Sequence, residues 1–205
     1  MAYSDFSLAK VRDDFGLILE EGKELFPKIE PVQPSSALKL ILADYIPLAT
    51  AISTEKARAE FLIAPLLAEV RRQCDNQISL FSGNEFPVDQ KRGLYGFCDY
   101  IVSASPEQFL ISAPVLTIVE AKKENIVGGL GQCIAAMVAA QIFNQKENRG
   151  VSTIYGAVTT GTNWKFITLT EKTASIDKTE YFINQLDKIL GILTKPFNQS
   201  IATTV

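Results

Sequence analysis

The chain has 205 residues, of which 47% are hydrophobic and 21% charged, a composition typical of one globular domain. Its formal net charge of −3 excludes the strongly basic balance of proteins that coat nucleic acid without specificity. The sequence contains no histidine, so Ser-His-Asp catalysis, Cys-His catalysis and imidazole zinc sites are excluded, and any bound metal would have oxygen ligands, which favour Mg²⁺ or Mn²⁺.

The first part of the chain has the pattern of three helices. The spacing of apolar residues predicts a helix over residues 4–25, and three prolines in residues 26–34 predict a connection. A second helix is expected from Ser35 or Ser36 to about residue 51, with Pro47 kinking or shortening it. A third helix is expected over residues 54–73, with a kink or restart at Pro65.

From residue 78 onward the pattern changes to strands. Strands are expected over residues 78–82, 94–103, 115–122, 153–158 and 164–169. The run over 115–122 is apolar without alternation, which is typical of a strand buried on both faces. Later helices are expected over residues 128–144 and 181–193.

This order of elements predicts an α/β fold with a central mixed β-sheet flanked by helices. The expected division is an N-terminal helical extension (1–53), a core (54–197) and a frayed C-terminal tail (198–205). Three widely separated cysteines without a CxxC pair indicate reduced thiols and a cytoplasmic location. No apolar run approaches the roughly 20 residues of a membrane span, and the first residues lack the order of a signal peptide, so neither is expected.

Candidate site residues lie on the two strands around residues 99 and 120. Positions two apart in a strand share a face, so Glu120 and Lys122 project together. On the preceding strand Asp99 shares a face with Phe97 and Ile101, which places a carboxylate on an apolar face. A buried carboxylate is costly unless a metal ion or a lysine compensates it. The pattern acid-x-Lys occurs three times in the chain, so an ordinary salt bridge explains it equally well on its own.

A wider resemblance favours the functional interpretation. The segments Gly96-Phe-Cys-Asp-Tyr100 and Val119-Glu-Ala-Lys122 resemble the active-site signature of the PD-(D/E)XK nuclease superfamily. The nearest likeness is to the N-terminal nuclease domain of type I restriction motor subunits. Thr160-Gly161 followed by Trp164-Lys-Phe166 is similar to a hairpin motif of these domains, and the likeness covers residues 55–170. Cys98 stands where the superfamily has its eponymous proline.

The resemblance implies a restriction endonuclease-like core and a metal-dependent phosphodiesterase. Asp99, Glu120 and the backbone carbonyl of Ala121 would bind Mg²⁺ or Mn²⁺, and Lys122 would orient the attacking water and stabilise charge on phosphorus. The superfamily often uses a further glutamate from the helix before the first strand. Glu69, on the same side of its helix as Leu62 and Leu66, is the expected one, and Glu60 is the alternative.

The same resemblance implies a glutamine in the first turns of the core helix. Gln132 is the expected residue, and Gln141, which points the opposite way, is the alternative. The expected partner is nucleic acid, with DNA favoured over RNA. A homodimer is also expected, because many such nucleases pair two active sites.

Six basic residues are candidates for contact with substrate, although each has an ordinary interpretation as a solvated charge. They are Arg71, Arg72, Lys91, Arg92, Lys123 and Lys165. Tyr100 and Trp164 are expected to be packing residues. Two other interpretations stay open: a catalytically inactive nuclease-fold module that binds nucleic acid or protein, and an unrelated α/β protein with a chance acid-x-Lys pattern.

Overall fold

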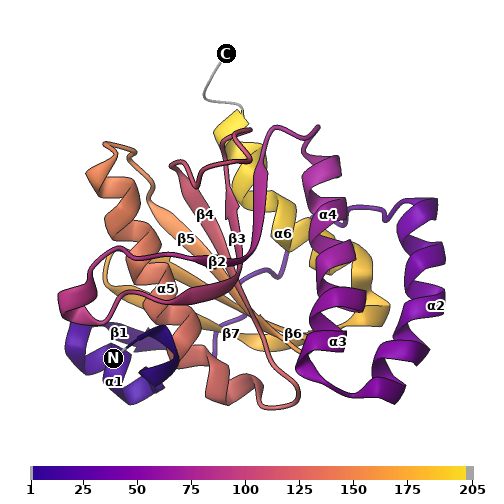
Figure 1. Ribbon diagram of the computed structural model, residues 1–205, viewed down its shortest axis with the longest axis horizontal. Coiled ribbons are helices and arrows are strands. Elements are labelled where there is room, and N and C mark those ends of the chain that lie inside the picture. Colours follow the sequence, from indigo (N-terminus) through magenta and orange to yellow (C-terminus); the bar gives the residue numbers. More distant parts are fainter. Residues whose placement is uncertain (1, 202–205) are drawn as a thin grey trace.

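The computed structural model describes residues 2–201 and has one seven-stranded mixed sheet with helices on both faces (Figure 1). The strand order is β1-β7-β6-β5-β4-β3-β2. The strands are β1 (Ile18–Glu20), β2 (Ser79–Glu85), β3 (Phe97–Ser103), β4 (Val115–Ala121), β5 (Thr153–Thr159), β6 (Asn163–Thr170) and β7 (Thr173–Phe182). The predicted α/β class and the mixed, helix-flanked sheet are therefore confirmed.

Only two neighbouring strand pairs are parallel. β4 runs parallel to β5, and the long helix α5 (Ile126–Lys146) connects them, as a parallel pair requires a crossover. β1 runs parallel to β7 at the sheet edge. The remaining neighbours are antiparallel, so β2, β3 and β4 form a meander.

The helices divide between two core clusters on the two faces of the sheet. On one face α5 and α1 (Leu8–Phe15) pack with strand residues such as Ile101 and Ile118. On the other face α4 (Ala64–Gln73) and α6 (Leu186–Ile201) pack with residues such as Val102 and Val119. Helix α2 (Ser36–Ile52) lies outside α4 on this second side (Figure 1).

The predicted helix over residues 54–73 is confirmed in an interrupted form. It consists of α3 (Glu55–Arg58), a π-helical turn (Ala59–Ile63) and α4. Pro65 lacks an N–H, and its ring crowds the carbonyl four residues earlier, which explains why the turn before it widens. The kink expected at Pro65 is thus a change in helical winding.

The prediction of one helix over residues 4–25 is wrong. Helix α1 ends at Phe15, where Gly16 takes a left-handed backbone with φ of 61°, and Ile18 then enters β1. A strand of three residues is too short to show periodicity, so no local pattern in the sequence predicts it. Residues 1–53 are consequently not a purely helical extension, since they contribute the edge strand of the sheet.

Strand β7 was not predicted, and the last helix begins later than expected. A register shift between Lys165 and Ile167 interrupts the β6–β7 ladder, so the buried positions of β7 do not alternate regularly. Residues 181–185, predicted to be helical, form the end of β7 and a 3-10 turn (Ile183–Gln185). Helix α6 continues through Ile201, and the last four residues of the predicted tail, 202–205, lie outside the described residues.

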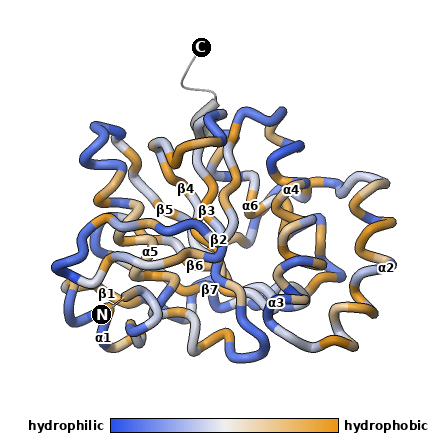
Figure 2. The backbone as a smooth tube through the Cα atoms, in the orientation of Figure 1, coloured by the Kyte–Doolittle hydropathy of each residue, from blue (hydrophilic) through white to orange (hydrophobic). Residues whose placement is uncertain are grey.

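Helix α5 is the central core helix. By length and composition alone it could cross a membrane, but 61% of its most apolar window is buried inside the fold, as in the core helix of a soluble protein. Figure 2 shows its hydrophobic residues lying among those of the sheet. It is the only candidate of this kind among the helices described.

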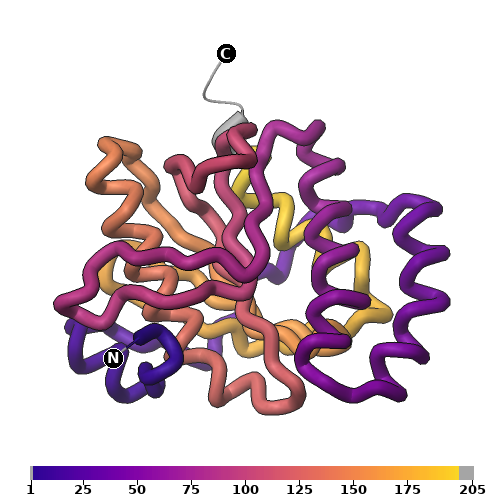
Figure 3. The backbone as a smooth tube through the Cα atoms, in the orientation of Figure 1, coloured from indigo at the N-terminus to yellow at the C-terminus, as the bar shows by residue number. Residues whose placement is uncertain are grey.

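The β2–β3 hairpin bends away from the sheet and lies over the N-terminal segment (Figure 3). Two hydrogen bonds fix it there: the Tyr3 hydroxyl donates to the Phe86 carbonyl at 2.6 Å, and the Tyr3 N–H donates to the Tyr95 carbonyl at 3.1 Å. Tyr3 is itself buried.

Candidate active site

Asp99 lies where the pairing of β3 with β4 ends. The last paired residues are Tyr100 and Val119, and beyond them the Ala121 N–H donates to Asp99 Oδ2 at 2.8 Å instead of to a backbone carbonyl. Gly83, which lies opposite Asp99 on β2, has a φ of 64°, a conformation that favours glycine. The strand therefore bends at Asp99, and its carboxylate turns toward the end of β4.

Glu120 on β4 and Lys122, directly after the strand, follow and face α5. Glu120 is in register with Val158 of β5, and its side chain is only 3% exposed. Lys122 Nζ donates to Glu120 Oε1 at 2.6 Å. The structure therefore brings together Asp99, Glu120 and Lys122, as the sequence predicted from their strand positions.

Gln132 of α5 completes the cluster. Lys122 Nζ donates to Gln132 Oε1 at 3.2 Å, so this side chain lies at the predicted place. Gln141, the alternative, instead donates to the Glu171 carbonyl at 3.1 Å. The close approach of α5 depends on Gly129, because a Cβ there would stand 2.9 Å from Lys122 Cε.

Burial and like charge make Glu120 a weak acid. Burial, and secondarily the neighbouring Asp99 carboxylate, raise the pKa of Glu120 to about 8, and Lys122 offsets only part of this rise. Burial lowers the pKa of Lys122, but the carboxylates of Glu120, Glu55 and Asp99 together outweigh burial and leave the pKa above its usual value. A cation bound beside Glu120 would favour its ionised form.

Glu55 was missed by the sequence analysis. It begins α3, and its Oε2 accepts a hydrogen bond from the Lys123 N–H at 3.2 Å. Its charge also contributes to the raised pKa of Lys122, so it lies beside the cluster. The only local signal was its position one residue after Thr54, the N-cap of α3, and nothing in the sequence ties that helix start to the end of β4.

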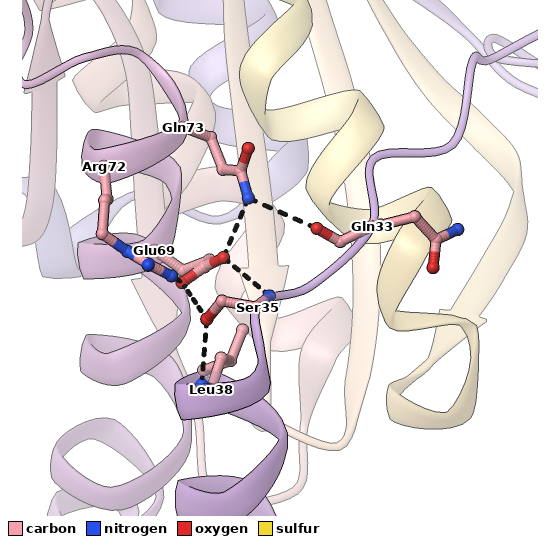
Figure 4. A network of polar contacts seen from close by, with 6 residues as sticks. All are labelled: Gln33, Ser35, Leu38, Glu69, Arg72 and Gln73. Atoms are coloured by element: carbon pink, nitrogen blue, oxygen red, sulfur yellow. Dashed lines mark hydrogen bonds and ion pairs between the residues drawn. The ribbon is translucent and has the colours of Figure 1, made fainter.

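Glu69, the predicted helix glutamate, is not brought to this cluster. It is buried on the apolar side of α4, as expected, but its carboxylate accepts hydrogen bonds from Ser35, Arg72 and Gln73 (Figure 4). Ser35 caps the start of α2, so Glu69 joins α2 to α4. Because α4 packs on the sheet face opposite α5, we leave Glu69 out of the candidate site.

The other glutamate considered, Glu60, is exposed and pairs with Lys56 at 3.3 Å. Its carboxylate therefore has an ordinary ion-pair partner on the protein surface. The two predicted packing residues are confirmed: Tyr100 is buried with its hydroxyl donating to the Ala59 carbonyl, and buried Trp164 donates to the Gly161 carbonyl.

Among the six basic candidates for substrate contact, Lys123 adjoins the cluster in sequence and is exposed. Arg71 donates to Asn76 and the Ile78 carbonyl, and Arg72 pairs with Glu69. Arg92 lies over the Phe15 ring, and Lys165 donates to the Lys178 carbonyl. Lys91 is exposed in a short 3-10 helix (Gln90–Arg92).

The hairpin between β5 and β6 supports the end of β4. The Lys122 N–H donates to the Thr159 carbonyl at 2.8 Å, and Arg58 of α3 donates to the Thr160 carbonyl at 3.1 Å. Arg58 Nε is buried without a hydrogen-bond partner. The Thr-Gly-x-x-Trp motif thus holds the backbone next to Lys122.

The donor set fits a hard cation such as Mg²⁺. Asp99, Glu120 and the Ala121 carbonyl supply oxygen, and Mg²⁺ is usually held by one or two carboxylates with water in its other positions. Over residues 2–201 no group of three or more His, Cys, Asp or Glu side chains is placed to hold a metal ion. Burial, followed by the charges of Glu120 and Asp99, raises the pKa of the Cys98 thiol, and a protonated thiol is a poor ligand for a hard cation.

Comparison with known proteins adds no family assignment. No protein-family model matches the chain, and the search of curated proteins found no significant match. The fold and the candidate site together define a class of protein. It is an α/β protein in which two facing carboxylates, a lysine and a glutamine meet at the end of a central buried strand.

Proposed function

We propose that this protein is a metal-dependent nuclease of the PD-(D/E)XK type that hydrolyses phosphodiester bonds of DNA. The observation that carries the proposal is the cluster at the end of β4, where Lys122 Nζ joins Glu120 and Gln132 and Asp99 lies on the neighbouring strand. The order α4-β2-β3-β4-α5-β5, with a β2–β4 meander and a parallel β4–β5 pair, supports a restriction endonuclease-like core.

Each residue has a distinct role in this proposal. Asp99, Glu120 and the Ala121 carbonyl would hold Mg²⁺ or Mn²⁺, which, when bound, polarises the phosphate and provides hydroxide near neutral pH. Lys122 places a cation beside the non-bridging phosphate oxygens, where negative charge develops in the transition state. Gln132 holds the ammonium of Lys122 in position, and Glu55 orders the backbone at Lys123.

The test combines metal binding with plasmid nicking. Wild type, Asp99→Asn and Glu120→Gln are titrated calorimetrically with MgCl₂ and MnCl₂, and each is incubated with supercoiled plasmid and the same metals. We expect wild type to bind metal and nick the plasmid, and both variants to lose nicking at least about 100-fold. Glu60→Gln, which alters an exposed carboxylate paired with Lys56, is the matched control and should nick like wild type. Nicking that persists in both site variants would overturn the proposal.

A catalytically inactive module that binds nucleic acid or protein is the second candidate. It is favoured by the fact that both carboxylates already have protein partners, Asp99 with the Ala121 N–H and Glu120 with Lys122. Metal binding by wild type without cleavage of plasmid, linear duplex, single-stranded DNA or RNA would support it over the nuclease.

The proposal extends to location and assembly. A cytoplasmic nuclease is consistent with the three free, buried cysteines among the residues described. A homodimer would bring two sites to the two strands of a duplex, and sedimentation velocity at micromolar concentration tests it: a single species of monomer mass contradicts the dimer.

A further inference from the structure

Phe97, the first residue of β3, is exposed although the strand that it begins is buried. Its side chain is 68% exposed, whereas Tyr100, Ile101 and Val102 are at most 3% exposed. No ring contact joins Phe97 to another aromatic side chain in the part of the chain described here. A single exposed apolar residue is ordinary on a protein surface, so only its position relative to the candidate site can indicate a function.

Phe97 stands two residues before Asp99. At a strand rise of about 3.3 Å per residue, the two backbone positions are roughly 7 Å apart, so the ring lies near any phosphate that is held at Asp99. Phe97 also pairs with Glu85 across the bent β2–β3 hairpin. Because Tyr3 fixes this hairpin at Phe86 and Tyr95, the ring is presented from a rigid segment.

Basic groups also belong to the cluster. Lys122 and Lys123 directly follow β4, where α3 meets the backbone through Glu55. An exposed aromatic ring and ammonium groups around one candidate site match the chemistry of a single nucleic-acid strand, whose bases stack and whose backbone is anionic.

We propose that Phe97 is a stacking surface for an unpaired base next to the scissile phosphate, so that the preferred substrate is single-stranded DNA. This inference rests on the proposed nuclease function. A base inside a duplex already stacks on both faces, whereas an unpaired base has a free face for the phenyl ring. Because every base has such a face, the preference is for strandedness and not for sequence.

The test measures the binding of a fluorescein-labelled oligothymidylate and of a blunt, labelled duplex of equal length. Wild type, Phe97→Ala and the control Phe109→Ala are compared by anisotropy in EDTA, where no cleavage occurs. Phe109 is a suitable control because it is fully exposed and lies in the loop joining β3 to β4, at the opposite end of these strands from Asp99. The melting temperatures of all three proteins are checked to be alike.

We expect wild type to bind oligothymidylate, Phe97→Ala to bind it about tenfold more weakly, and Phe109→Ala to bind it like wild type. The affinity for the duplex should be the same in all three proteins. Equal affinity of wild type and Phe97→Ala for oligothymidylate, an equal loss for duplex, or no binding of oligothymidylate by wild type would each overturn the inference.

A second variant reports stacking directly. Phe97→Trp adds an exposed indole to a chain whose only natural tryptophan, Trp164, is buried. Its emission should be quenched on addition of oligothymidylate but not of duplex, and absence of quenching at saturating oligothymidylate would contradict stacking. These binding results are independent of cleavage. Weaker oligothymidylate binding by Phe97→Ala, with no metal-dependent cleavage of plasmid or oligothymidylate by wild type, would contradict the nuclease proposal but not base stacking. Metal-dependent cleavage by wild type, with no effect of Phe97→Ala on binding, would contradict the stacking inference but not the nuclease proposal.

Discussion

At the scale of single residues, the contacts of Lys122 bear most directly on the proposed function. Its ammonium lies between a buried carboxylate and the Gln132 amide, and its side chain is only 21% exposed. A lysine so confined loses the mobility of a surface lysine, and its charge is held at one place. That is the property a phosphate-binding cation needs, since preorganised charge favours the transition state without rearrangement.

Replacing this ammonium tests its role. Lys122→Met should lower the rate of plasmid nicking at least about 100-fold, because a preorganised cation is lost from the site. The fold should survive, because the pKa of Glu120 is raised to about 8 even beside Lys122, so near pH 7 this buried carboxyl can stay neutral when its partner is removed. Circular dichroism checks the fold. Lys123→Met, one residue further and exposed, should change the rate less than about threefold; equal losses in both variants would refute a specific role for Lys122.

At the scale of elements, the contact between α5 and β4 depends on one buried amide. Asn144 accepts a hydrogen bond from the Val115 N–H at 2.8 Å and donates to the Val115 carbonyl at 2.7 Å. The side chain therefore pairs with the first residue of β4 as a neighbouring strand would. This contact fixes the end of the central strand, at whose other end the candidate site lies.

Removing the amide should destabilise the protein. Asn144→Ala leaves two backbone groups of Val115 without those partners, and we expect the free energy of unfolding to fall by about 2–4 kcal/mol. Urea denaturation followed by circular dichroism measures it. Gln145→Ala, which changes an exposed amide on the same helix, should shift the free energy by less than about 0.5 kcal/mol. A loss below about 1 kcal/mol for Asn144→Ala would show that water replaces the amide.

The attachment of α2 to α4 should depend on pH. Burial raises the pKa of Glu69, but hydrogen bonds from Gln73, Arg72 and Ser35 outweigh it, so the pKa lies below its ordinary value of 4.5. A carboxyl with a lowered folded-state pKa stabilises the fold above its unfolded pKa and loses this contribution as pH falls through the folded pKa. Glu69→Gln should therefore cost about 1–3 kcal/mol at pH 7 and much less near pH 3. Urea denaturation at both pH values measures the difference, and a cost that does not change with pH would contradict it.

At the scale of the whole molecule, the N-terminal residues are part of the domain. β1 pairs with β7, α1 packs on α5, and the Leu25 N–H donates to the buried Asp177 carboxylate of β7. Gly131 of α5 permits the close approach of the segment before α1, because a Cβ there would collide with the Phe6 carbonyl oxygen. The N-terminal segment and the core should therefore unfold together.

A methyl group at Gly131 tests this integration. Gly131→Ala must displace the backbone at Phe6 and Ser7, and we expect the free energy of unfolding to fall by about 1–3 kcal/mol. Gly150→Ala, whose added Cβ would meet nothing within 4 Å, should be nearly neutral. The measurement is urea denaturation. If Gly131→Ala were as stable as wild type and the first 20 residues became protease-sensitive alone, the segment would be a separable extension.

The sequence alone determined the class of fold and three members of the cluster. The apolar run over 115–122 and the alternating faces of two strands are local patterns, so they predicted that Asp99, Glu120 and Lys122 meet. The choice of Gln132 rather than Gln141 came from the resemblance to the PD-(D/E)XK superfamily, whereas the helical period predicted that Glu69 lies on an apolar face. The faces of strands and helices follow from side-chain periodicity, which a chain carries in any context.

Only the tertiary structure decided the rest, because it depends on contacts between distant segments. The three residues of β1 become a strand only against β7, whose own alternation a register shift interrupts. A π-helical turn before Pro65 changes the phase between the start of α3 and α4, so an ideal helical period could not relate Glu55 to Glu69. Because α4 packs against α2, the Glu69 carboxylate accepts a hydrogen bond from the Ser35 N–H. Because α3 lies against the end of β4, Glu55 reaches the candidate site.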